Sequence, residues 1–299
     1  MKRNNLAMIN YSFPLYRPPA EADNIILQAT FGCSHNRCTY CSMYKSKRFT
    51  IRPIEELKEE IGILSYRYPD ANKVFLADGD ALSLFIEHLA KLLRLLKEAF
   101  SRLSRVSLYT TAQNFLEKSV DELKFLRAGG LSLGYFGIET GNDELLEKID
   151  KGVNSSKMIE ALTKAHEAGI KISSTVILGL GGLEHTHEHI RDTIKLINAA
   201  PMTYLSTLQL GLEEGSVERF RRSFNAFTPL NDHQILQEQR HLLSELNPPQ
   251  KIIFRSNHAS NALHLSGTLP KNTSRMIDEI NEALRIGEGA MVPKRFRGF

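Results

Sequence analysis

The sequence predicts an α/β fold, namely a partial (β/α)6 TIM-like barrel with a C-terminal extension. Short apolar runs alternate with amphipathic helical stretches from about residue 25 to residue 255, which is the pattern of repeated βα units. The runs are apolar almost throughout, as is typical of parallel strands buried on both faces. The connections are short, and 299 residues are enough for one such barrel.

Seven apolar runs are expected to form the strands. In chain order they are IILQAT at 25–30, KVFLAD at 73–78, VSLYTT at 106–111, LSLGYFGIE at 131–139, KISSTVILG at 171–179, YLSTLQL at 204–210 and KIIFRS at 251–256. In a βα barrel the carboxyl ends of these strands meet on one face.

The helices between the strands have recognisable end signals. Pro53 precedes apolar residues spaced three or four apart, so a helix is expected to begin there. Ser119 and Glu122 have the spacing of a capping box, and Gly129 closes that helix. Further helices are expected to open at Asn154 or Ser155, to end at Gly169, and to span 272–285.

The chain reads as one βα domain, because no linker rich in proline or serine divides it. We expect an N-terminal arm at 1–24, a barrel core at 25–215, and a C-terminal extension at 216–299 that completes the barrel mouth. The composition is 42% hydrophobic and 24% charged without a long apolar run, which excludes a transmembrane segment. No apolar stretch typical of a signal peptide precedes Pro14, so we expect a cytoplasmic protein.

Charge gives only a weak indication of partners. The net charge of +4 and the pI near 8.8 do not by themselves indicate nucleic-acid binding. The basic run YKSKRFTIR at 44–52 is denser. It is either a solvated loop or a site for a substrate phosphate or an acidic electron-donor protein, and the sequence leaves these alternatives open.

Polar side chains follow most of the predicted strands, and we place the chemistry there because barrel active sites are built at the carboxyl ends of strands. These residues are Asp78 and Asp80, Thr111, Gln113 and Asn114, Glu139, Gln209 and Glu213, and Arg255, Asn257 and His258.

All three cysteines of the chain, Cys33, Cys38 and Cys41, lie in the stretch FGCSHNRCTYCSMYK at 31–45. A disulfide is disfavoured by the odd number and the expected reducing compartment. A structural zinc site requires a fourth ligand, and His35 lies awkwardly between the first two cysteines. Closely spaced thiolates favour an iron-sulfur cluster, and three ligands would leave one iron of a four-iron cluster open to a small molecule.

The spacing C-x4-C-x2-C, with Tyr40 before the last cysteine and after a first barrel strand, resembles the cluster loop of the radical S-adenosylmethionine (radical SAM) superfamily. The usual spacing in that family is C-x3-C-x2-C, so this loop has one inserted residue. The run GIETGNDELLEKIDKG at 137–152 is similar to a segment of the branch that includes oxygen-independent coproporphyrinogen oxidase and methylthiotransferases. The resemblance covers about residues 25–215.

The resemblance implies a 4Fe-4S cluster on the three cysteines and S-adenosylmethionine on the open iron. It further implies cosubstrate-binding roles for side chains and turns near the strand ends. The turn of Asp78, Gly79 and Asp80 would hold the methionine amino group, and Glu139 would bind the ribose or the methionine end. Ile177 and Gly179 would flank adenine. Tyr40 and Gln113 are also expected to contact the cosubstrate.

By the same resemblance the enzyme would cleave S-adenosylmethionine reductively to a 5′-deoxyadenosyl radical that abstracts hydrogen from a small organic substrate. A flavodoxin-like or ferredoxin-like protein would supply the electron. No cysteine remains for an auxiliary cluster, so methylthio transfer is disfavoured, and an oxidoreductase or lyase reaction is expected. The alternatives are a non-catalytic iron-sulfur or metal-binding sensor and an enzyme that modifies RNA.

Two further segments contain candidate functional residues. In FRSNHASNALHLSGTLP at 254–270, Arg255 and His258 are candidate catalytic residues, one to hold a carboxylate or phosphate and the other to transfer a proton. The alternative for this segment is a polar loop with a helix N-cap. His185 and His189 lie four apart, but we interpret 182–190 as a solvated helix end and not as a metal site.

Overall fold

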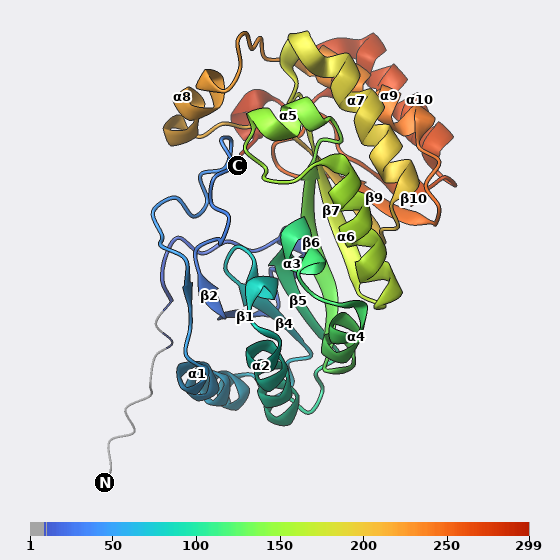
Figure 1. Ribbon diagram of the computed structural model, residues 1–299. Helices are drawn as coiled ribbons and strands as arrows, with labels where there is room; N and C mark the ends of the chain where they lie inside the picture. The colour runs from blue at the N-terminus through green and yellow to red at the C-terminus, as the bar shows by residue number, and fades with distance from the viewer. Residues whose placement is uncertain (1–8, 10, 299) are drawn as a thin grey trace. The chain divides into compact units, whose positions relative to one another are not determined.

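The computed structural model describes residue 9 and residues 11–298 (Figure 1). In this part of the chain a mostly parallel sheet has the strand order β1-β4-β5-β6-β7-β8-β9-β10. Its strands are β1 (Ile25–Gln28), β4 (Lys73–Ala77), β5 (Arg105–Thr110), β6 (Leu131–Glu139), β7 (Lys171–Leu178), β8 (Tyr204–Gln209), β9 (Ile252–Ser256) and β10 (Leu265–Leu269). All seven predicted strands are present. None of the described helices is both long and apolar enough to cross a bilayer.

The described chain divides into two compact units. The first contains the described residues up to Asn36 together with 43–135 and 167–170, and the second contains 37–42, 136–166 and 171–298. The division falls within the cysteine loop, so Cys33 belongs to the first unit, and Cys38 and Cys41 belong to the second.

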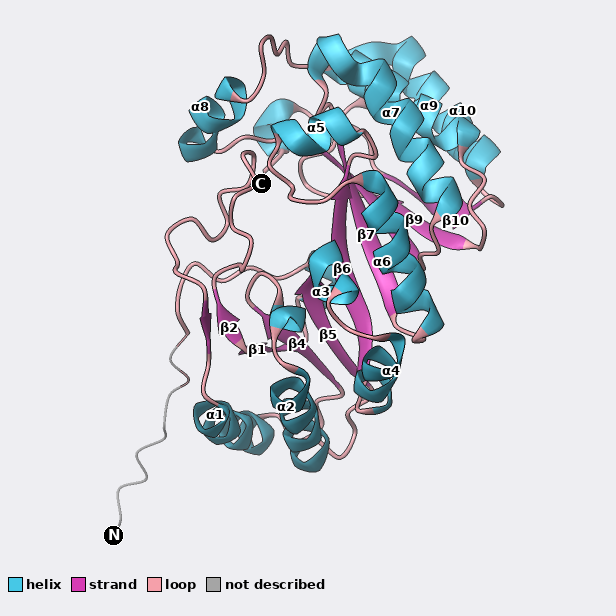
Figure 2. Ribbon diagram, in the orientation of Figure 1, coloured by secondary structure: helices cyan, strands magenta, loops and turns pink. Residues whose placement is uncertain are grey.

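The first unit pairs β1 with β4 and β4 with β5 in parallel. Its helices are α1 (Ile54–Arg67), α2 (Ile86–Ala99), α3 (Ala112–Leu116) and α4 (Val120–Ala128), and a short antiparallel ribbon joins β2 (Thr30–Phe31) to β3 (Thr50–Ile51). Helix α2 packs against α1 and α4 on one side of the strands (Figure 2). Pro53 precedes α1, and Ser119 with Glu122 forms the expected capping box of α4.

The basic run at 44–52 is largely committed to contacts within the first unit. Tyr44 is 4% exposed, and the side chain of Lys47 is 6% exposed. Arg52 is buried and donates to both carboxylate oxygens of Glu60, at 2.9 and 2.8 Å. The interpretation as a solvated loop is therefore wrong for these three residues. Tyr44 is buried in the core, and the buried charges of Lys47 and Arg52 have carboxylate partners that the folded chain supplies.

The second unit pairs β7 with β8 and β8 with β9 in parallel. Its helices α7, α9 and α10 lie side by side along these strands (Figure 1). The helices of this part of the chain are α5 (Asp143–Lys148), α6 (Ser155–Glu167), α7 (Gly182–Ala199), α8 (Glu214–Arg222), α9 (Asp232–Glu245) and α10 (Thr273–Ile286). Two short 3-10 helices follow, η3 (Gly287–Ala290) and η4 (Lys294–Phe296).

The segment 254–270 is not only a loop. Residues 265–269 form β10, which pairs with β9 in antiparallel register from Leu265 opposite Ser256 to Leu269 opposite Ile252. The residues of LSGTL alternate between apolar or small and polar, and with a glycine at its centre this short run becomes a strand by pairing with β9.

His189 is fully buried on the inner face of α7, so the expectation of a solvated helix end is wrong at this residue. Its ring lies between Thr140 Oγ1 at 2.8 Å and the carbonyl oxygen of Ile177 at 3.0 Å. A carbonyl only accepts, so Nε2 carries the proton and donates to Ile177. Burial lowers the pKa of His189 to about 4, and the ring is therefore neutral near pH 7.

This buried imidazole predicts a loss of stability in mild acid. Between about pH 6.5 and pH 4 the unfolded chain binds a proton at His189 that the folded protein does not, so the free energy of unfolding falls as the pH falls. From pH 7 to pH 5 this one group should remove about 2 kcal/mol. Urea denaturation of the wild type, of His189→Gln and of the exposed control His166→Gln at both pH values measures it. His189→Gln should lack this part of the loss, and equal losses in all three proteins would contradict the assignment.

Candidate functional site

None of the three cysteines forms a disulfide, and each is partly exposed. Among the described residues, no three histidine, cysteine, aspartate or glutamate side chains are gathered closely enough to hold a single metal ion. A preformed mononuclear zinc site is therefore not found in the described chain. Thiolates that ligate a four-iron cluster bind different irons and need not converge on one point, so three cysteines on one loop fit such a cluster.

In the first unit, the residues after β4 hold the backbone on either side of Cys33. Asp78 accepts a hydrogen bond from the amide of Gly32 at 3.0 Å. Asp80 accepts from the amide of Ser34 at 2.9 Å and also from its hydroxyl. Both carboxylates are fully buried, and burial raises the pKa of Asp80 while the bonds from Ser34 oppose that rise.

Gly79 is required between these two aspartates by the approach of the cysteine loop. Its amide donates to the carbonyl of Gly32 at 3.0 Å. A Cβ atom at Gly79 would lie 2.6 Å from the Cβ of Cys33, which is far inside van der Waals contact. The absence of a side chain therefore lets the backbone of this turn lie directly against the first cysteine.

The charge of Asp78 is balanced inside the protein. Lys47 Nζ lies 2.8 Å from its Oδ2, and Gln28 donates to its Oδ1 at 3.0 Å. The side chains of Asp78 and Asp80 thus bind the protein's own backbone and side chains. A role for the backbone of this turn in holding the methionine amino group stays a prediction.

In the second unit, Glu139 at the end of β6 accepts two hydrogen bonds on one oxygen. Tyr40, which lies between Cys38 and Cys41, donates from its hydroxyl to Oε1 at 2.8 Å. Lys151 donates to the same oxygen, also at 2.8 Å, and the side chains of Lys151 and Glu139 are 14% and 9% exposed. No hydrogen-bond donor from the described residues reaches Oε2, so this second oxygen can accept hydrogen bonds from hydroxyl groups of a ligand.

The protonation states in this cluster follow from burial and neighbouring charge. Burial, the charge of Glu139 and the nearby Cys38 and Cys41 hold the pKa of Tyr40 well above its usual value. Burial by itself would lower the pKa of Lys151, but Glu139 and the two cysteines outweigh it and raise the pKa to about 12. Near neutral pH, Tyr40 is therefore a neutral donor and Lys151 a cation.

The segment GIETG at 137–141 contains the residues that this geometry requires. Glu139 has a φ of 62°, in the left-handed region that is rare for a residue with a side chain. Its carboxylate lies over Gly137, where a Cβ atom would come within 1.9 Å of Oε1. A Cβ atom at Gly141 would lie 2.3 Å from the carbonyl oxygen of Asp192 on α7. The lack of a side chain at each glycine therefore leaves space for the Glu139 carboxylate and for the Asp192 carbonyl, which any larger residue would displace.

Arg219 on α8 holds the second half of the cysteine loop, a role that the sequence analysis missed. Its guanidinium donates to the carbonyl of Thr39 at 3.0 Å and to the carbonyl of Cys41 at 2.8 Å. The amide of Thr39 in turn donates to the carbonyl of Ile149 at 2.9 Å. No motif in the sequence pointed to Arg219. Lys151 was indicated only as part of the lysine-glycine pair that ends the 137–152 motif.

The end of β7 is shaped by Glu238 of α9. The amide of Gly179 donates to the Glu238 carboxylate at 2.6 Å, and Thr186 donates to its other oxygen at 2.7 Å. Burial raises the pKa of Glu238 to about 7 against these two bonds. Gly179 has a φ of 79°, and its amide is committed to Glu238, while Ile177 is 4% exposed. Contact of these residues with adenine stays a prediction.

Three other predicted site residues make side-chain hydrogen bonds to residues close to them in the sequence. Gln113 is exposed and donates to Glu117 of the next turn at 2.7 Å. Arg255 is exposed and donates to the carbonyl of Phe254 at 2.8 Å. His258 is partly buried beside Ser260 Oγ at 2.9 Å, and burial lowers its pKa. Nothing in these contacts tests the proposed roles of Arg255 and His258 in catalysis or of Gln113 in cosubstrate binding.

Comparison with known proteins matches residues 27–197 to the Radical SAM superfamily. The chain is 28% identical over 192 residues to the heme chaperone HemW of Bacillus subtilis, covering 62% of this chain and 50% of the relative. It is 22% identical over 183 residues to a putative methylthiotransferase of Methanocaldococcus jannaschii, covering 57% and 39%. The chain thus spans half or less of the length of these curated relatives.

The crystal structure of coproporphyrinogen III oxidase (HemN) from Escherichia coli superposes with a TM-score of 0.55 at 18% identity, covering 74% of this chain and 50% of that one. Together with the strand order, this likeness confirms the predicted α/β fold of the partial TIM-like barrel type.

The ion pair of Glu139 and Lys151 predicts a large cost for removing one partner. Lys151→Met should lower the free energy of unfolding by roughly 3 kcal/mol, because it leaves a buried carboxylate without its counter-charge. Lys157→Met breaks the exposed pair with Glu160 and should cost less than about 0.5 kcal/mol.

Urea denaturation compares the two variants. Adding Glu139→Gln to Lys151→Met should restore part of the loss, because no unpaired charge then remains. A Lys151→Met protein as stable as Lys157→Met would show that the pair does not hold the end of β6.

Proposed function

The chain belongs to the radical SAM superfamily, and on that premise we propose that it is an enzyme that cleaves S-adenosylmethionine reductively and abstracts hydrogen from a small organic substrate. Membership implies a 4Fe-4S cluster and S-adenosylmethionine. Cys33, Cys38 and Cys41 would hold the cluster, which after reduction by an external electron donor would supply the one electron needed to cleave the sulfonium carbon-sulfur bond of S-adenosylmethionine.

The observation that carries this proposal is the hydrogen bond from Tyr40 to Glu139. It joins the stretch between two candidate cluster ligands to the carboxylate assigned to the cosubstrate, within one compact unit. Cys33, Cys38 and Cys41 would hold three irons, which leaves the fourth for the amino and carboxylate groups of S-adenosylmethionine. The free Oε2 of Glu139 would accept hydrogen bonds from the ribose or from the methionine amino group.

The remaining parts of the site support binding and orientation. Gly79 brings backbone close to Cys33, where it would meet the methionine end of the cosubstrate. The backbone at Ile177 and Gly179 would lie along adenine, with Gly179 fixed by Glu238. Arg219 holds the carbonyls of Thr39 and Cys41 and so would help to keep the nearby thiols in position.

The electron would come from an acidic flavodoxin-like or ferredoxin-like protein. Arg48 is an exposed cation in the basic run near the cysteine loop, while Lys47 and Arg52 are committed to internal carboxylates. Opposite charge at such a surface increases the rate of association more than it increases affinity.

Anaerobic reconstitution followed by reduction tests the proposal. The full chain should bind about four irons per protein, and with S-adenosylmethionine and dithionite it should yield 5′-deoxyadenosine and methionine, measured by liquid chromatography and mass spectrometry. A four-iron protein that gives neither product would favour the sensor over the enzyme.

The ligand assignment is tested by Cys38→Ala. Loss of one of three thiolates should reduce the iron content and the cluster absorbance severalfold and abolish cleavage of S-adenosylmethionine. Ser42→Ala, in the same loop, serves as the control and should retain both. Full turnover by Cys38→Ala would rule out this cysteine as a ligand.

A further inference from the structure

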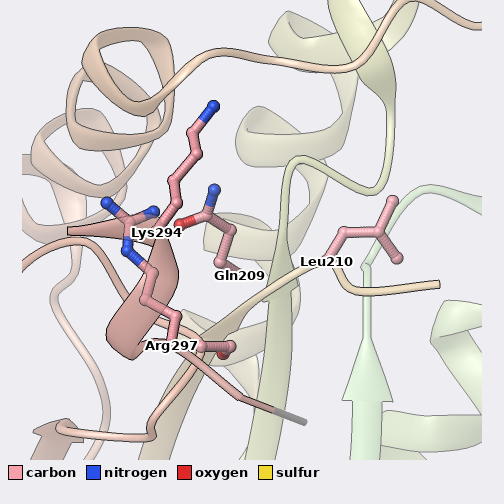
Figure 3. Close-up of a pocket in the computed structure, with 5 residues that line it drawn as sticks. Gln209, Leu210, Lys294 and Arg297 are labelled. Carbon is pink, nitrogen blue, oxygen red and sulfur yellow. The ribbon is translucent and has the colours of Figure 1, made fainter. Parts of the chain in front are cut away.

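A cavity of about 230 Å³ lies in the second unit, lined by Gln209, Leu210, Ser260, Lys294 and Arg297 (Figure 3). Gln209 is the last residue of β8. The cavity thus lies at the carboxyl end of a parallel strand, where enzymes of βα architecture bind their substrates. No cosubstrate or cluster role is assigned to any of its residues.

The walls of the cavity are built by two segments that the chain folds over the strand end. Asn261 donates to the carbonyl of Thr207 at 2.8 Å and accepts from the amide of Gln209 at 2.8 Å, which fixes the loop after β9. The C-terminal segment then binds this loop, since the amide of Val292 donates to the carbonyl of Ala262 at 2.8 Å. This contact brings η4, and with it Lys294, to the cavity.

The charges of the cavity leave one cation available. Arg297 donates two hydrogen bonds to the carboxylate of Asp232, at 2.7 and 3.0 Å, so these two charges balance each other. Lys294 is exposed and makes no ion pair within 4 Å among the described residues, and its charge acts only at longer range on Asp232, whose pKa it helps Arg297 to lower. Figure 3 shows its side chain beside that of Arg297 and the amide of Gln209. The local charge is therefore positive and is carried by a side chain free to meet an anion.

Gln209 provides a hydrogen-bond acceptor beside this cation. Its amide nitrogen donates to Asp232 at 3.2 Å, which fixes the orientation of the side chain because the carbonyl end would be repelled there. Its Oε1 is buried and has no donor among the described residues. A buried acceptor without a partner is costly, so this oxygen is placed to accept from a ligand hydroxyl or amine.

We propose that this cavity binds the acidic end of the enzyme's substrate, a carboxylate or phosphate group with a hydroxyl or amine nearby. That the anion belongs to a substrate rests on the proposed function, whereas the binding of an anion in this cavity does not. Lys294 pairs with the anion, Ser260 lines its cavity, and Gln209 accepts from the neighbouring donor. The volume suits an end group of a few heavy atoms, so the rest of the substrate extends out of the cavity.

Calorimetric titration of the reconstituted full chain with inorganic phosphate, succinate and malate tests this proposal, with saturating S-adenosylmethionine and no reductant present so that the open iron is covered. The anion of the correct class should bind saturably, and Lys294→Met should weaken it roughly tenfold through loss of one charge-assisted hydrogen bond. Arg295→Met removes a charge from the same turn without lining the cavity, and it should change the affinity less than about twofold. Absence of saturable binding by all three probes, or equal affinities of Lys294→Met and the wild type, would overturn the proposal.

The comparison of malate with succinate tests Gln209, because malate adds one hydroxyl group to succinate. If carboxylates bind, the wild type should prefer malate and Gln209→Met should remove the preference. Equal binding of the two acids by the wild type would overturn the role of Gln209.

Cleavage of S-adenosylmethionine by the wild type is measured separately. Anion binding without cleavage would leave the cavity standing and reject the proposed enzyme, and cleavage without anion binding would reject the cavity alone.

Discussion

The carboxylate of Glu139 fixes the arrangement of the second unit's part of the site. One oxygen accepts from both Tyr40 of the cysteine loop and Lys151 of the turn after α5. The backbone of Glu139 adopts a φ of 62°, and the lack of a side chain at Gly137 leaves space for the carboxylate. Such a conformation is unfavourable for a residue with a side chain and persists where surrounding contacts hold it. Two charge-assisted hydrogen bonds in a buried setting supply that hold.

Much of the anchoring of the cysteine loop acts on its backbone, in addition to the side-chain hydrogen bonds of Ser34 and Tyr40. In the first unit Asp78 and Asp80 accept from the amides of Gly32 and Ser34, and in the second Arg219 donates to the carbonyls of Thr39 and Cys41. None of the three cysteines is in a disulfide, so anchoring through the backbone is compatible with thiolates that ligate a cluster. This anchoring also explains why charged residues are buried at this site, since each is paired with several polar groups of the loop.

Much of the fold followed from local patterns. The seven strands, the capping box of α4 and the helix after Pro53 are determined by residues close together in the chain, so periodicity and end signals predict them. The errors concern residues whose partners are distant in sequence. His189 looked solvated because its helix start is polar, but Thr140 and Ile177 enclose it. Residues 265–269 looked like a loop because only β9 makes them a strand.

The sequence by itself identified the family to which this protein belongs. Three cysteines in nine positions and the GIETG segment identify a cluster loop and a family, because ligand type and spacing are local properties. Only the tertiary structure decided which carboxylate Tyr40 meets, that Arg219 holds the loop, and that Lys294 reaches the end of β8. These contacts join residues far apart in the chain, and no local pattern specifies them, because they form only when the elements have packed.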